Sequence, residues 1–180
     1  MKKFIIATVF ALMPSLFFAQ QSVFDKFEGL DDVTTVVVTK KMFEMMGKVK
    51  MDPKDKEAQK FVNLTGKLNN LKVFTTSNTK LSADLKVTAE KYLKTAGLEE
   101  LMRVKDGGQN IRILIKTGAK DTQVKELLMF IEDSGKNSET VLMSLTGNFD
   151  LDDLSVLTDK MNLPGGNVLS KGSKGSKGPK

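Results

Sequence analysis

The side chains that could carry out chemistry in this 180-residue chain are carboxylates, lysines and a single tyrosine, Tyr92. The chain has no histidine and no cysteine, so it lacks the usual proton shuttle at neutral pH and the usual thiol nucleophile. Zinc sites and Ser-His-Asp triads need the same residue types, and no glycine-rich phosphate-binding motif occurs. We therefore predict a protein that is not an enzyme, with no catalytic residue, no cofactor and no metal ligand.

The densest group of carboxylates follows Asn148 and comprises Asp150, Asp152 and Asp153, with Asp159 further along. Its alternating oxygens partly match a calcium-binding loop, but Asp153 stands at the sixth position, where such a loop needs glycine. Apolar residues at helical spacing follow. We therefore favour Asp150 as a helix cap, with the next two acids near the positive end of the helix dipole.

A group of methionines, Met42, Met45, Met46 and Met51, allows two interpretations. Thioethers can bind cuprous ion in an exported protein. Methionine more often fills irregular gaps in a core, and Phe43 lies in the same segment. We favour core packing.

Two pairs of adjacent acids, Asp31-Asp32 and Glu99-Glu100, are interpreted as a turn or a solvated strand edge rather than as a general acid and base. The alternative is a hydrolase that uses two carboxylates, as glycosidases do. Its first candidates are Asp150, Asp152 and Glu99.

The first 19 residues have the pattern of a secretory signal peptide. Lys2 and Lys3 precede a short apolar run that ends at Ala19, although Phe17 stands where a small side chain is usual. The run is shorter than the roughly 20 residues that span a bilayer. Because a thioether-linked lipid anchor needs cysteine, we expect a soluble exported protein of the periplasm or cell envelope, without a membrane span and not a lipoprotein.

The net charge of +6 comes from the two ends of the chain. When the two leader lysines and the four lysines of residues 171–180 are set aside, 22 basic residues balance 22 acidic ones. The body therefore lacks the excess of positive charge expected of a nucleic-acid-binding domain. Residues 164–180 are rich in Gly, Ser and Lys and are predicted to be disordered. They could contact anionic lipid or serve only as a solubilising tail or linker.

Helical spacing of apolar residues predicts four helices. The first covers residues 40–47, the second follows a cap at Asp52-Pro53, and the third begins at Ser77 or Asn78 and ends at Gly97. The fourth follows Asp150 and reaches Met161. The lead-in, residues 20–32, precedes a single domain over residues 33–163.

Strands are predicted at residues 33–39, which are rich in β-branched side chains and should be well buried, and at 71–76. Four more follow at residues 98–105, 111–117, 124–132 and 140–146, with hairpin residues between them. The expected fold is α+β, a single mostly antiparallel sheet with helices packed on one face. The helices between the first two strands could make that pair parallel.

The segments 126–135 and 138–155, with Gly147, the acids and a short helix, resemble a family of small exported proteins of Bacteroidetes bacteria. This family is known as domain of unknown function 4252. The resemblance extends from about Val33 to Met161 and implies export and an α/β domain. It implies no catalytic residue.

Three functions are consistent with these observations. The leading hypothesis is a non-enzymatic module that binds another protein in the cell envelope. The alternatives are the carboxylate-dependent hydrolase and a periplasmic carrier of a small ligand, in a pocket between helices and sheet. The oligomeric state and the partner are not determined by the sequence.

Overall fold

The computed structural model describes residues 23–49, 52, 54–120, 122–134 and 138–153. The predicted signal peptide, the tail at 164–180 and the part of the predicted last helix beyond Asp153 lie outside these residues. The described elements occur in the order η2 (Asp25–Phe27), β1 (Thr34–Thr39), α2 (Lys40–Met46), α3 (Lys56–Thr65), β2 (Leu68–Thr76), α4 (Thr79–Ala96), β3 (Glu99–Asp106), β4 (Gln109–Thr117), β5 (Gln123–Asp133), β6 (Thr140–Asp150) and η3 (Leu151–Asp153).

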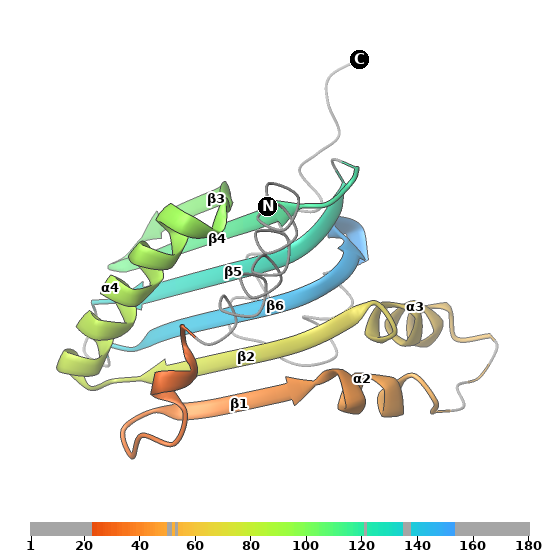
Figure 1. Cartoon of the computed structure of the whole chain (residues 1–180), viewed down its shortest axis with the longest axis horizontal. Coiled ribbons are helices and arrows are strands. Elements are labelled where there is room, and N and C mark those ends of the chain that lie inside the picture. Colours follow the sequence, from red (N-terminus) through yellow and green to blue (C-terminus); the bar gives the residue numbers. More distant parts are fainter. Residues whose placement is uncertain (1–22, 50–51, 53, 121, 135–137, 154–180) are drawn as a thin grey trace, which may run out of the picture.

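The strands form one open sheet in the order β1-β2-β6-β5-β4-β3 (Figure 1). Every neighbouring pair is antiparallel, so the α+β prediction is confirmed. The suggestion that the first two strands run parallel is wrong. The two helices between them lie beyond the ends of β1 and β2 rather than across a face, and the chain therefore returns antiparallel.

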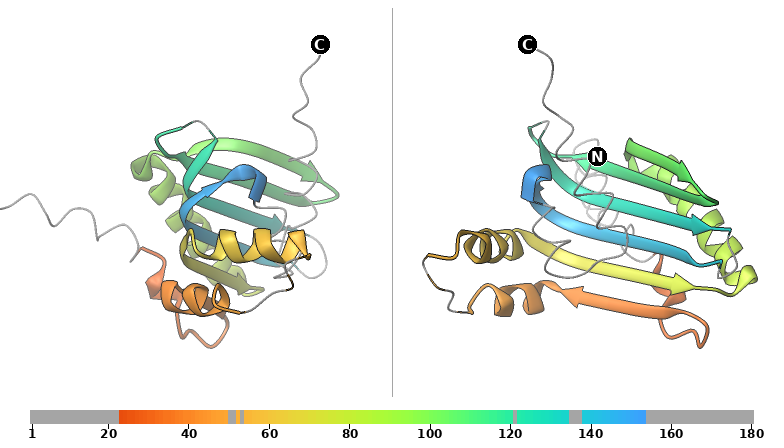
Figure 2. Two further views of the ribbon diagram at one scale, coloured as in Figure 1. Left: turned by 90° about the vertical axis from the view of Figure 1, so that its right-hand side faces the viewer. Right: turned by 180° about the vertical axis from the view of Figure 1, so that it is seen from behind.

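Of the described helices, α4 alone lies along a face of the sheet (Figure 2). Its packing joins Leu85, Ala89 and Tyr92 to sheet residues that include Phe74 and Phe130. The helices α2 and α3 instead contribute Phe43 and Leu64 to a separate cluster of buried residues. The structure therefore does not confirm the expected packing of all helices on one face.

The register explains why there are two clusters. Residues that face each other across antiparallel strands point to the same side of the sheet, and Phe74, Leu142 and Phe130 form one such row on the α4 side. The next residue along each strand points to the opposite side. There a row runs across all six strands, from β1 to β3: Val36, Val73, Met143, Met129, Ile113 and Met102.

The lead-in is part of the α4 side. Phe24 and Phe27 of this segment are buried and pack at an angle against Phe74, with ring centroids 6.5 and 6.1 Å away. Lys72 on β2 forms ion pairs with Asp25 and Glu28. These contacts attach the segment before β1 to β2.

Helix starts and ends follow local chemistry. Asn78 caps α4 by accepting hydrogen bonds from the backbone of Lys80 and Leu81, as predicted, and Gly97 ends the helix with a φ of 66° that glycine adopts without strain. The predicted cap at Asp52 is wrong, because Asp55 caps α3 through the backbone N–H of Ala58.

In the described part of the chain, no helix is both long and apolar enough to cross a membrane.

Candidate functional site

The carboxylates proposed for a hydrolase do not form a described pair. Asp150 ends β6 and Glu99 begins β3, and two strands separate these two. Three strand spacings amount to about 14 Å, more than the roughly 5–9.5 Å that separates the carboxyls of a glycosidase. The side chain of Asp152 lies outside the described part of the structure. The geometry therefore gives no support to catalysis by Glu99 and Asp150 together.

Asp150 and Asp153 instead surround a lysine. Lys67 Nζ lies 3.4 Å from Asp150 Oδ2 and 2.8 Å from Asp153 Oδ2. The hydrogen bond to Asp153 is the largest cause that raises the pKa of Lys67. Asp150 lies at the end of a strand that is four residues longer than predicted, and its described contact is this ion pair rather than a helix cap. Both acids therefore attach the end of β6 to the beginning of β2.

Gly147 allows the same two segments to approach closely. A side-chain carbon at this position would lie 2.5 Å from the backbone oxygen of Lys67, which is too close for any residue but glycine. That oxygen accepts a hydrogen bond from the backbone N–H of Asn148 at 2.8 Å. The run of glycine and acids that marks the resemblance thus has a structural explanation in this chain.

A buried carboxylate, which the sequence analysis did not single out, lies beneath α4. The hydroxyl of Tyr92 is 2.8 and 2.9 Å from the two carboxylate oxygens of Glu126, and both residues are buried. Desolvation raises the pKa of Glu126, and the hydrogen bond from Tyr92 only partly offsets this effect. Desolvation and the nearby Glu126 raise the pKa of Tyr92. This pair fixes α4 to β5.

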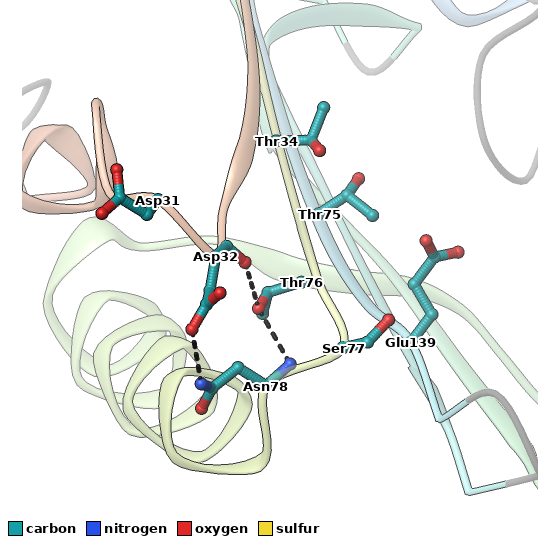
Figure 3. Close-up of a pocket in the computed structure, with 8 residues that line it drawn as sticks. All are labelled: Asp31, Asp32, Thr34, Thr75, Thr76, Ser77, Asn78 and Glu139. Carbon is teal, nitrogen blue, oxygen red and sulfur yellow. Dashed lines mark hydrogen bonds between the residues drawn. The ribbon is translucent and has the colours of Figure 1, made fainter.

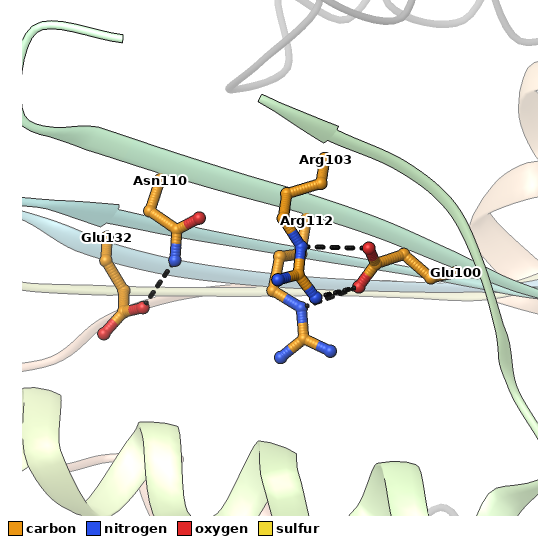
Figure 4. Close-up of polar contacts among 5 residues, drawn as sticks. All are labelled: Glu100, Arg103, Asn110, Arg112 and Glu132. Carbon is orange, nitrogen blue, oxygen red and sulfur yellow. Dashed lines mark hydrogen bonds and ion pairs between the residues drawn. The ribbon is translucent and has the colours of Figure 1, made fainter. Parts of the chain in front are cut away.

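A network of charges covers the α4 side of β3 and β4 (Figure 4). Glu100 accepts hydrogen bonds from Arg103 at 2.9 and 2.6 Å and from Arg112 at 3.1 Å. The bonds from Arg103, and then the bond from Arg112, lower the pKa of Glu100. Asn110 donates to Glu132, which also pairs with Lys86 of α4 at 2.7 Å. The charged groups of this network are paired with one another, whereas the buried amide oxygen of Asn110 has no described hydrogen-bond partner.

A polar hollow of about 480 Å³ lies where β1 begins and β2 ends (Figure 3). Asp31, Asp32 and Glu139 contribute carboxylates to its lining. Asp32 accepts a hydrogen bond from the Asn78 side chain at 2.8 Å, and its backbone oxygen accepts one from Thr76 at 2.7 Å. No group of three or more carboxylates among the described residues is arranged to hold a metal ion. Asp32 therefore has a structural contact at the turn before β1.

The methionines of α2 only partly match the core-packing prediction. Phe43 is fully buried and Met46 packs against the same cluster. Met42 and Met45 are 50% and 57% exposed, so the prediction is wrong for these two. Because α2 lies beyond the end of the sheet, only one side of this short helix has neighbours to pack against. Met51 lies outside the described residues.

The β1 edge is an exposed surface without charge. We use this name for Thr34–Thr39, a strand without a charged residue. One side of β1 pairs with β2, and no described element lies beyond its other side (Figures 1 and 2). Val36 and Val37 are 47% and 41% exposed. The predicted strand is confirmed, but the predicted burial is wrong because the strand takes an edge position.

The fold and this edge define an open antiparallel α+β domain whose uncharged strand β1 is paired on one side only. Residues 27–157 match the family described as "Domain of unknown function (DUF4252)", and this match covers most of the chain. The chain therefore belongs to that family. No curated protein and no solved structure matches the chain.

Proposed function

We propose that this chain is an exported, non-enzymatic protein of the periplasm or cell envelope, and that it binds a protein partner through the β1 edge. The observation that carries the proposal is the exposed, uncharged strand itself. Along its free side, an edge strand offers a row of backbone donors and acceptors to which another strand can add. Val36 and Val37 are exposed on opposite faces of the sheet, and both add apolar area to that contact.

The sequence supports export and a binding role. The leader has the order of a signal peptide, and the chain lacks the histidine and cysteine on which much enzyme chemistry depends. The described hollow at the start of β1 is lined by polar side chains, whereas small-ligand pockets are mostly apolar. The edge is therefore a better candidate for binding than the hollow.

Crosslinking in intact cells tests this proposal. Cells that carry tagged wild-type protein, Val36→Lys or Leu101→Lys are fractionated, crosslinked and used for affinity capture. We expect the tagged proteins in the envelope fraction, and a crosslinked partner with the wild type and Leu101→Lys but not with Val36→Lys. Leu101 is a matched control, because it is also 47% exposed but lies on β3. Equal capture by all three proteins, or recovery from the cytosol, would contradict the proposal.

A further inference from the structure

Charges flank the uncharged β1 edge in a definite order. Asp31 and Asp32 precede the strand, and Lys40 and Lys41 follow it. All four are exposed. Among the described residues, Asp31, Lys40 and Lys41 have no ion-pair partner. The edge therefore has a negative end and a positive end, with an apolar middle.

We infer that the partner of the β1 edge is a second copy of this chain, bound antiparallel about a two-fold axis at Val36. This inference rests on the proposed function, because it names the occupant of the same edge. A two-fold interface joins the same surface of both copies. If one residue of the first copy contacts a second residue of the other copy, the reverse contact also occurs. The order of charges along β1 meets this requirement.

The charges favour an antiparallel pairing centred on Val36. When Val36 lies opposite Val36 of the second copy, the turn that carries Asp31 and Asp32 falls at the end of the strand pair where Lys40 and Lys41 begin α2 of the other copy. The acids and lysines are thereby brought to the same end of the interface, once on each side of the axis. A parallel arrangement in the same register would instead place acids beside acids and lysines beside lysines, which is unfavourable.

The buried row of the sheet also ends at Val36. On the side opposite α4, its cross-strand neighbours Val73 and Met143 are 6% and 1% exposed, whereas Val36 is 47% exposed. In the antiparallel pair, Val36 of each copy lies directly beside the other, on the same face of a continuous sheet. The apolar row then continues from one copy into the next and its exposed end becomes covered.

The ends of the interface carry further exposed apolar side chains. Leu30 lies before the acids and Met42 lies in the first turn of α2, and these residues are 38% and 50% exposed. An antiparallel arrangement brings the loop of one copy that contains Leu30 towards the α2 helix of the other. The contact therefore extends beyond the six residues of the strand.

Sedimentation equilibrium of the protein in its natural processed form tests the inference. We expect the wild type to show a concentration-dependent equilibrium between monomer and dimer. Val36→Lys places two positive charges opposite each other and should raise the dissociation constant at least about tenfold. Leu101→Lys should leave the dissociation constant unchanged. Circular dichroism and thermal melting establish that each variant is folded.

The outcomes separate this inference from the proposed function. A wild type that stays monomeric at every concentration, or a folded Val36→Lys that dimerises like the wild type, overturns self-pairing. If self-pairing fails while Val36→Lys still loses its partner in cells, the edge binds another protein and the proposed function stands. If Val36→Lys changes neither measurement, both are wrong.

Discussion

The two edge strands of the sheet, β1 and β3, differ in their charged residues. The β1 edge has no charged residue over Thr34–Thr39, whereas five of the eight residues of β3, Glu99–Asp106, are charged. The register of β3 with β4 also shifts between Glu100 and Met102. Charges and bulges are the usual devices that prevent an edge strand from pairing with another chain. One edge of this molecule has both devices, and the other has neither.

This difference between the edges indicates that the exposed valines of β1 belong to a binding surface. A single exposed apolar residue on a protein surface is ordinary, but an uncharged edge strand is a template for pairing. Because β3 shows that the same sheet can protect an edge, we interpret the lack of protection on β1 as a requirement for binding.

The largest effect is expected when the protection of β3 is removed. Arg103→Val together with Lys105→Val makes the second edge more apolar, so that each molecule can pair through both edges and grow beyond a dimer. Light scattering should show large, concentration-dependent assemblies. Lys91→Val with Lys94→Val removes the same charge from α4 and should leave the mass unchanged. An unchanged mass in the β3 variant would mean that its charges do not protect the edge.

A change beneath α4 should affect folding and leave both edges as they are. Burial raises the pKa of Glu126 above its unfolded value, so the folded state prefers the protonated carboxyl. The contribution of this carboxyl to the free energy of unfolding is therefore greatest below the pKa that Glu126 has in the unfolded chain. It is lost as the pH rises through the higher pKa of the folded state. Glu126→Gln should remove this decline relative to the wild type, without changing the dimer dissociation constant. Urea unfolding at several pH values measures the free energy of unfolding of both proteins. If it changes with pH in the same way in the wild type and in Glu126→Gln, the raised pKa is not that of Glu126.

A smaller effect is expected from the charges beside β1. Asp31→Lys and Lys41→Asp should each weaken self-association by a few-fold, because an exposed ion pair contributes about 0.2–1 kcal/mol. An equimolar mixture of the two variants should regain association, since each acid then faces a lysine of the other chain. High salt should reduce the difference. If the mixture associates no better than either variant alone, the proposed register is wrong.

Much of the sheet could be predicted because its signals are local. The β-branched run of β1, the glycine and asparagine turns of the later strands, and the Asn78 and Gly97 ends of α4 each depend on neighbouring residues. The edge position of β1 could not be predicted in this way. A β-branched run has the same composition in the centre and at the edge of a sheet, and only the pairing of distant strands distinguishes the two positions.

The same limit applies to the side chains around the candidate site. The contact between Lys67 and Asp153 joins residues 86 positions apart, and that between Tyr92 and Glu126 joins residues 34 apart. No local pattern marks either contact. Glu126 follows Lys125 and precedes five apolar residues of β5, and this position gives little sign of a buried carboxylate. The acids and lysines that flank β1 can be identified in the sequence. Their role at an interface can be proposed only when β1 is known to be an edge strand.

Oxidative crosslinking of two single-cysteine variants tests pairing through the β1 edge directly, because the chain has no cysteine of its own. With the two-fold axis at Val36, Val36→Cys places its thiol opposite the equivalent thiol, within reach of a disulfide. Val37→Cys lies opposite Thr35, and its two thiols are diagonal neighbours whose Cα atoms are about 7–8 Å apart, at or beyond the limit for a disulfide. We predict a covalent dimer for Val36→Cys and little or none for Val37→Cys. Equal crosslinking of both variants, or of neither, would contradict pairing through the β1 edge in this register.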